Sequence, residues 1–250
     1  MRAFNQTPDK PGGFGFKVLW FALKAFGPAA VVEALELREA TPANWESGLA
    51  AVYASESNDA WVFVSPPIAG WTLAVSCFWP YPTTQSHDDA GRKFDALFSR
   101  LMKRFDDVQF YGSHRVVDFV TWARGVNGEA MRIFAWTGCE GVVLENIGER
   151  TSEEAKLGLA NLTGLSPADA GDEIFRLVEQ QTAEEETLIA AGLSGREARA
   201  RVRQNSGHAF PDETDVVELA GLWSIDPSRL SEHDHPPSLG LAARLPENLR

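Results

Sequence analysis

The sequence predicts an α+β protein, in which a mainly antiparallel sheet of about six or seven strands carries packed helices and a helical insertion. Two observations predict this class. Segments rich in Val, Phe and Trp dominate the chain up to residue 148, and one strongly amphipathic helix interrupts them. From residue 151 onward, helix-forming segments with capping motifs replace them. A run of strands followed by a run of helices is typical of α+β proteins.

The amino-terminal segments are assigned from composition and periodicity. Residues 1–16 contain Pro and Gly without periodicity and predict an irregular arm. Residues 17–30 predict a short amphipathic helix and not a signal peptide, because Lys24 interrupts the apolar run. A second helix is predicted over 28–37, with Pro28 at its start. Three strands in a meander are predicted for the segments rich in Trp, Val and Phe, at residues 43–54, 60–65 and 70–76.

The clearest helix is predicted over residues 91–105, after a loop over 77–89 that is rich in Pro, Ser and Thr. Its apolar side chains recur at i, i+3, i+4, i+7, i+8 and i+11, and they are Phe94, Leu97, Phe98, Leu101, Met102 and Phe105. These positions form one stripe along a helix, which predicts that the helix packs on the sheet.

A β-hairpin is predicted over residues 116–138, closed by a tight primed turn at its Asn-Gly pair. With a two-residue turn, the numbers of opposing residues sum to 255. Phe119 is then expected to face Trp136, and Trp122 to face Ile133. Both faces of this ribbon are apolar, which predicts a central position in a sheet that is covered on both sides.

After a last predicted strand over 140–148, the chain is expected to be mainly helical. Four capping patterns, each a Ser or Thr followed after three residues by an acid, begin at Thr151, Ser166, Thr182 and Ser194. Residues 211–223 predict a further helix, and the tail after it predicts a loosely packed extension. The chain therefore divides into a sheet-and-helix core (1–160), a helical insertion (161–210) and a closing helix with its tail (211–250), which we expect to form one structural domain.

The formal net charge of -12 and the pI of about 4.9 predict a protein that repels nucleic acid and anionic membranes and attracts basic partners. No apolar run approaches the roughly 20 residues that cross a bilayer. The chain contains two cysteines, Cys77 and Cys139, which we expect to be buried thiols in strands. Free thiols fit a reducing compartment, so a cytoplasmic location is predicted.

Motifs that carry chemistry are scarce. The sequence has no glycine-rich phosphate loop, no GxSxG elbow and no HExxH pair, so we predict no catalytic residue, metal or cofactor. The pair His233 and His235 sits in a Pro-rich tail, and His87 precedes two acids at a helix start, where solvated side chains are the favoured interpretation. His114 could act as an acid/base oriented by Asp118, but a turn in which Arg115 pairs with a neighbouring acid is favoured.

Negative charge is concentrated between residues 144 and 190, where eleven acids and three bases give a difference of -8. In one explanation, these acids cap helices and pair with the arginines that follow at 196, 199, 201 and 203. In the other, some of them remain unpaired and form a negative face for a basic partner. We assign Glu184, Glu185 and Glu186 to that face, because three consecutive residues in the first turn of a helix capped by Thr182 cannot all face one neighbour.

Three segments of the chain, WVFVSPPIAGWTLAVS, HRVVDFVTWARGVNGEAMRIFAW and PDETDVVELAGLWSIDP, resemble a group of uncharacterised bacterial proteins associated with immunity to polymorphic or type VI secreted toxins. They contain no catalytic residues, so the resemblance implies a shared fold, and the helical insertion departs from it. Together with the acidic charge and the lack of catalytic motifs, it favours a non-enzymatic cytoplasmic immunity protein that binds a basic toxin. The alternatives are an enzyme with a dispersed site near His114 and Asp118, and a structural or regulatory subunit of another complex.

Overall fold

The structure is a computed structural model that describes residues 3–25, 27–84, 89–207, 209–232 and 234–249. Its strands are β1 (Val18–Leu23), β2 (Arg38–Ala43), β3 (Trp61–Val64), β4 (Thr72–Ser76), β5 (Asp107–His114), β6 (Phe119–Val126), β7 (Glu129–Thr137), β8 (Val142–Gly148) and β9 (Gly240–Arg244). Its α-helices are α1 (Pro28–Ala34), α2 (Trp45–Tyr53), α3 (Ala90–Met102), α4 (Ser152–Lys156), α5 (Pro167–Ala190), α6 (Gly195–Ser206) and α7 (Glu213–Trp223). Two short 3-10 helices, η1 (Pro227–Glu232) and η2 (Glu247–Leu249), complete the described elements.

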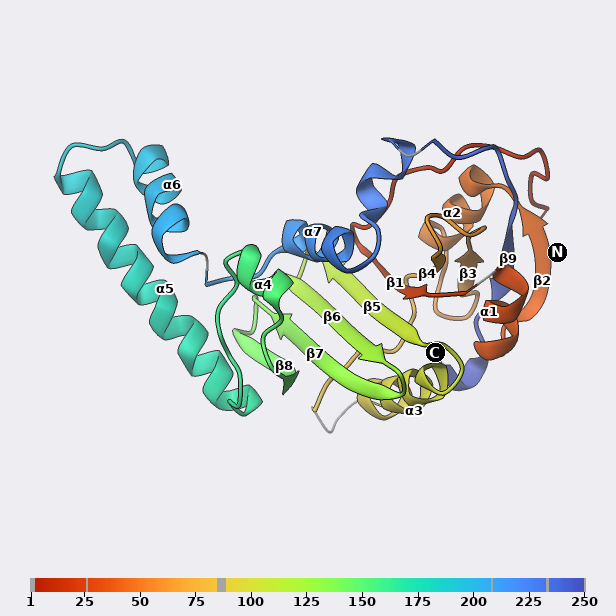
Figure 1. The fold of residues 1–250 in the computed structure, drawn as a ribbon, viewed down its shortest axis with the longest axis horizontal. Helices are drawn as coiled ribbons and strands as arrows, with labels where there is room; N and C mark the ends of the chain where they lie inside the picture. The colour runs from red at the N-terminus through yellow and green to blue at the C-terminus, as the bar shows by residue number, and fades with distance from the viewer. Residues whose placement is uncertain (1–2, 26, 85–88, 208, 233, 250) are drawn as a thin grey trace.

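The nine strands of the described residues form one antiparallel sheet in the order β2-β9-β3-β4-β1-β5-β6-β7-β8 (Figure 1). The predicted α+β class is therefore confirmed, with more strands than the six or seven expected. Strands β5 to β8 follow one another as a meander, and β1 joins them to the other half of the sheet. Helices α5 and α6 form a hairpin that extends away from the sheet beyond β8 (Figure 1).

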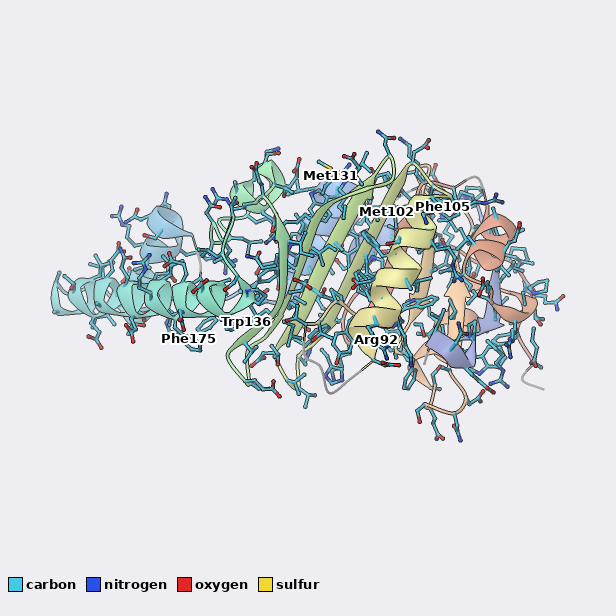
Figure 2. The ribbon with its side chains drawn as sticks, turned by 90° about the horizontal axis from the view of Figure 1, so that it is seen from below. Arg92, Met102, Phe105, Met131, Trp136 and Phe175 are labelled. Atoms are coloured by element: carbon cyan, nitrogen blue, oxygen red, sulfur yellow. The ribbon has the colours of Figure 1, made fainter. Side chains whose placement is uncertain are left out.

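The sheet is covered on both faces, as its apolar strands require. Trp20 and Phe21 of β1 point into different cores, because successive side chains of a strand alternate between faces. Helices α2 and α7 pack with Trp20 on one face, whereas α1 and α3 pack with Phe21 on the other. Figure 2 shows α3 lying across that second face. The stripe predicted for this helix is confirmed, with Phe94, Leu97 and Leu101 buried against the sheet.

The predicted hairpin is present, but its predicted register is wrong. Asn127 and Gly128 both have positive φ (52° and 88°), as a primed turn requires. One residue, Met131, is extra on β7, because Gly125 pairs with Ala130 whereas Arg124 pairs with Arg132. This β-bulge shifts every later pair by one position.

Because of the bulge, Phe119 pairs with Thr137 and not with Trp136, and Trp122 pairs with Phe134 and not with Ile133. The rings of Trp122 and Phe134 stack with their centroids 4.6 Å apart. Both rings belong to the core under α7, whereas Ile133 belongs to the core under α3. The expectation that both faces of the ribbon are covered is nevertheless confirmed, but β6 and β7 lie next to the edge strand β8 and not at the centre of the sheet.

Two predictions of secondary structure near the amino terminus are wrong, one for a strand and one for a helix. Residues 18–23, expected within a helix, form β1 at the centre of the sheet. A strand that is buried on both faces is apolar throughout and loses the alternation by which strands are recognised. Residues 45–53, expected as a strand, form α2, which starts where the Asn44 side chain accepts a hydrogen bond from the Ser47 amide (3.0 Å).

Further expectations fail in the tail and at the cysteines. Residues 240–244 are not a loose extension but form β9, inserted between β2 and β3. Neither cysteine lies in a strand: Cys77 follows β4 and is half-buried, and Cys139 is exposed in the turn between β7 and β8. In the part of the chain that the structure describes, no helix has the length and hydropathy of a membrane span.

Candidate functional site

The α5–α6 hairpin is the element that most clearly leaves the body of the protein. Helix α5 has 24 residues and is therefore about 36 Å long. Its first turns are held against β8 by Ala170, Gly171 and Ile174, which are all buried. The Ser166 side chain caps its start by accepting a hydrogen bond from the Asp169 amide (3.2 Å). Beyond these turns α5 packs against α6, so one of its sides faces away from the protein.

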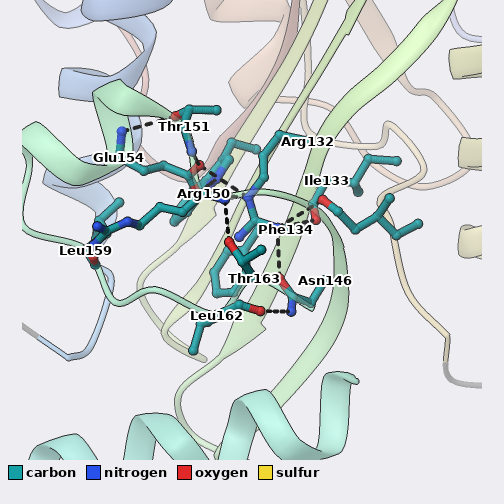
Figure 3. Close-up of polar contacts among 12 residues, drawn as sticks. Arg132, Ile133, Phe134, Asn146, Arg150, Thr151, Glu154, Leu159, Leu162 and Thr163 are labelled. Carbon is teal, nitrogen blue, oxygen red and sulfur yellow. Dashed lines mark hydrogen bonds and ion pairs between the residues drawn. The ribbon is translucent and has the colours of Figure 1, made fainter. Parts of the chain in front are cut away.

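A buried ion pair fixes the segment that leads into this hairpin (Figure 3). Arg132 of β7 donates to Glu154 of α4 with its Nε 3.0 Å from Oε1, and both side chains are almost fully buried. The same carboxylate accepts hydrogen bonds from the Trp122 indole (2.9 Å) and from the Thr151 amide (2.7 Å). These contacts satisfy a carboxylate that would otherwise be costly to bury.

The loop that follows is tied to the same point (Figure 3). Asn146 accepts a hydrogen bond from Arg132 (2.8 Å) and donates from Nδ2 to the carbonyl oxygens of Leu162 (2.8 Å) and Leu165 (2.9 Å). Because residue 165 directly precedes the cap of α5, this chain of hydrogen bonds sets where the hairpin leaves the sheet. We call Arg132 of β7, Asn146 of β8 and Glu154 of α4 the polar node, and its role is to position the α5–α6 hairpin.

The structure separates the three acids that the sequence assigned to a partner-binding face. Glu185 lies 2.9 Å from Arg199 of α6, and Glu184 accepts a hydrogen bond from Asn205 (3.3 Å). Both are half-buried between the helices. Glu186 is exposed, and no hydrogen bond or ion pair joins it to another described residue. The structural explanation therefore holds for Glu184 and Glu185, and Glu186 is available to a partner.

The predicted helix start at Thr182 is wrong. Thr182 lies in the middle of α5, where its hydroxyl donates to the carbonyl oxygen of Val178 (2.8 Å). The sequence at Thr182 matches the capping motif, but within a helix a Thr hydroxyl can instead donate a hydrogen bond to a carbonyl oxygen of the preceding turn. The capping predictions at Thr151, Ser166 and Ser194 are confirmed.

An exposed side of α5 carries a regular pattern that Glu186 belongs to, and we call it the α5 stripe. Its members recur at heptad spacing and are all exposed: Asp172, Phe175, Glu179, Thr182, Glu186 and Ile189. A heptad repeat drifts by only about 20° per seven residues on a straight helix, so the six side chains share one side over about 26 Å. Acids seven residues apart are separated by about 10.5 Å.

The acids of the α5 stripe are not neutralised within the described structure. No hydrogen bond or ion pair joins Asp172, Glu179 or Glu186 to another described residue. The nearby Arg176 is already paired with Glu173 of the same helix (2.7 Å), and this hydrogen bond lowers the pKa of the Glu173 carboxyl. The stripe therefore presents three negative charges to solvent.

Aromatic side chains surround the base of the α5 stripe. Phe175 is 44% exposed, and its ring centroid lies 6.2 Å from that of the buried Trp136 of β7 (Figure 2). Phe210 is 41% exposed and lies 5.8 Å from Trp136 and 6.2 Å from Phe175. Large aromatic rings that are half exposed and supported from below are common anchors of protein interfaces.

The structure does not bring His114 and Asp118, the residues of the acid/base alternative, to one cavity. His114 borders a cavity of about 710 Å³, whereas Asp118 borders a different cavity of about 520 Å³. An acid/base and the carboxylate that orients it must share a hydrogen bond, and these two side chains face separate spaces. The turn interpretation is confirmed for Arg115, which pairs with Glu213 at 2.8 Å, whereas His114 is the last residue of β5.

No group of three or more His, Cys, Asp or Glu within the described ranges is placed to hold a metal ion. His87, Asp88 and His233 lie outside the described residues. No family model, curated protein or solved structure matches this chain. The function of the α5 stripe is accordingly inferred from its own chemistry.

Proposed function

We propose that this protein is a non-enzymatic binding protein that recognises a basic partner protein along the α5 stripe. The observation that carries the proposal is the row of exposed carboxylates of Asp172, Glu179 and Glu186, flanked by the exposed apolar side chains of Phe175 and Ile189. Surface acids usually pair with neighbours or scatter. Here they repeat at one spacing on a helix that extends away from the body of the protein (Figure 1).

The two kinds of side chain have different tasks in binding. Each exposed charge contributes only about 0–1 kcal/mol to affinity, but together the charges raise the association rate with a basic surface. Phe175 is the anchor, because burial of a large aromatic ring contributes more to affinity than an exposed charge does. Its ring is already supported by Trp136, so little conformational entropy is lost when the partner covers it.

Within this class, we propose a cytoplasmic immunity protein that binds and neutralises a secreted bacterial toxin. The net charge of -12 and the resemblance of the framework segments support this choice. A helix that projects from a rigid sheet suits the obstruction of a catalytic cleft. In an enzyme assembled around His114 or Asp118, or in a regulatory subunit of another complex, the α5 stripe has no such task.

The product of the gene immediately upstream is the partner to test. It is expressed in bacteria in three ways: by itself, together with the wild-type protein, and together with the Glu179→Lys/Glu186→Lys variant. We expect growth arrest by the upstream product, relief by the wild-type protein and loss of relief with the variant. A matched control, Glu56→Lys/Glu129→Lys, changes the net charge equally at exposed acids outside the α5–α6 hairpin and is expected to keep the relief. An upstream product that neither arrests growth nor binds this protein overturns the immunity proposal.

A further inference from the structure

The cavity that Asp118 borders lies between the turn from β5 to β6, the end of β7 and the start of α7. It measures about 520 Å³, which is large enough for a side chain of another molecule, and we call it the Asp118 cavity. No member of the α5 stripe lines it. Its aromatic wall consists of Phe119, Trp136 and Phe210, and charged side chains stand around this wall.

The charged side chains of the Asp118 cavity are three carboxylates and one guanidinium, a formal difference of -2. The guanidinium is already neutralised, because Arg115 pairs with Glu213, with its Nη2 2.8 Å from Oε1 and its Nε 3.3 Å from Oε2. Asp212 caps α7, and its Oδ1 accepts hydrogen bonds from two amides of the first turn (2.7 and 3.2 Å). The helix amides that would otherwise favour an anion here are therefore satisfied within the protein.

Asp118 is the carboxylate that remains unpaired. It is exposed, and no hydrogen bond or ion pair joins its side chain to another described residue. Its φ is 48°, a left-handed conformation that Asp and Asn adopt more readily than most residues. The turn is held in place by hydrogen bonds from the Gly138 amide to the Asp118 carbonyl oxygen (3.1 Å) and from the Thr137 hydroxyl to the Val117 carbonyl oxygen (3.2 Å). A fixed turn therefore presents a free carboxylate at the cavity.

The aromatic wall joins the Asp118 cavity to the base of the α5 stripe. Trp136 and Phe210 both line the cavity, and the ring centroid of each lies 6.2 Å from that of Phe175, which belongs to the stripe (Figure 2). A partner that covers Phe175 is therefore brought next to this cavity.

We propose that the Asp118 cavity takes up an arginine side chain of the basic partner, an inference that rests on the proposed function. The excess of negative charge attracts a cation, and the free carboxylate of Asp118 can accept two parallel hydrogen bonds from a guanidinium. The planar guanidinium also stacks on an aromatic face, which the half-exposed ring of Phe210 provides. A lysine ammonium is more strongly hydrated and lacks this planar fork, so it fits the cavity less well.

The first test uses the full chain and three small amides, so it needs no partner protein. An NMR titration follows the indole signal of Trp136, which lines the cavity. N-acetylarginine amide should bind roughly fivefold more tightly than N-acetylcitrulline amide, which has the same shape without the charge, and more tightly than N-acetyllysine amide. Asp118→Asn, which keeps a residue suited to positive φ, should weaken binding of the arginine amide by roughly fivefold. Glu140→Gln makes the same charge change on the neighbouring turn, outside this cavity, and should leave binding unchanged.

The second test uses the complex with the upstream gene product. Asp118→Asn should raise the dissociation rate and leave the association rate nearly unchanged, because a charge pair that is covered in a complex acts mainly on its lifetime. The arginine pocket is overturned if either other amide binds as tightly as the arginine amide, if Asp118→Asn behaves like Glu140→Gln, or if the dissociation rate does not change. Each of these results leaves the α5 stripe in place. An upstream product that does not bind overturns the proposed function instead, and the titration with the amides still decides what the cavity selects.

Discussion

Replacement of Glu154 by Leu tests the polar node that positions the hairpin. Glu154 and Arg132 are 2% and 3% exposed at their side chains, so the variant leaves a guanidinium buried without its counter-charge. Removing one partner of a buried ion pair costs about 3–5 kcal/mol. The Trp122 indole and the Thr151 amide lose their acceptor as well, which places the expected loss toward the upper end of that range.

The loss is measured by urea denaturation of the wild-type protein, Glu154→Leu, Arg132→Met and the double variant. For a chain of this size, a loss of 3–5 kcal/mol lowers the Tm by about 6–20 °C. The double variant should recover most of the stability, because no unpaired charge remains buried. A loss below about 1 kcal/mol for Glu154→Leu, or losses that simply add in the double variant, would refute the buried, coupled pair.

Three further predictions concern the sheet and the thiols. Trp136→Ala should lower the free energy of unfolding by about 3–5 kcal/mol, since the side chain is 1% exposed; thermal denaturation measures this loss. Deletion of Met131 should leave the fold intact by circular dichroism, whereas deletion of Ile133 should disrupt it, because only Met131 is extra on β7. Burial raises the pKa of Cys77 to about 11, so in a pH series Cys139 should react with iodoacetamide first and Cys77 only as the pH rises toward 11.

The sequence predicted the elements whose signal is local. The apolar stripe of α3 and the Asn-Gly turn depend on periodicity and on backbone conformations that few residues adopt, and both were placed correctly. The register beyond that turn could not be predicted, because the bulge at Met131 depends on how β7 also pairs with β8. Gly148 of β8 lies so close to the Met131 carbonyl that any side chain there would clash with it.

Two of the missed elements are strands whose neighbours in the sheet are distant in sequence. β1 and β9 lie inside the sheet, and neither shows the alternation of a strand with one solvent face. The α5 stripe was present in the sequence as a heptad pattern, but the capping motif at Thr182 suggested a helix start in its middle. Only the continuity of α5 across Thr182 brings Glu179 and Glu186 onto one side.

The association rate of the proposed partner protein with the α5 stripe tests the central claim most directly. The wild-type protein, Glu179→Lys/Glu186→Lys and the control Glu56→Lys/Glu129→Lys are compared by stopped-flow mixing with the upstream gene product at low and moderate salt. The account predicts that only the stripe variant associates more slowly, by roughly tenfold at low salt, and that the difference shrinks as salt screens the charges. Equal association rates for the two folded variants would remove the α5 stripe from the interface and contradict the proposed function.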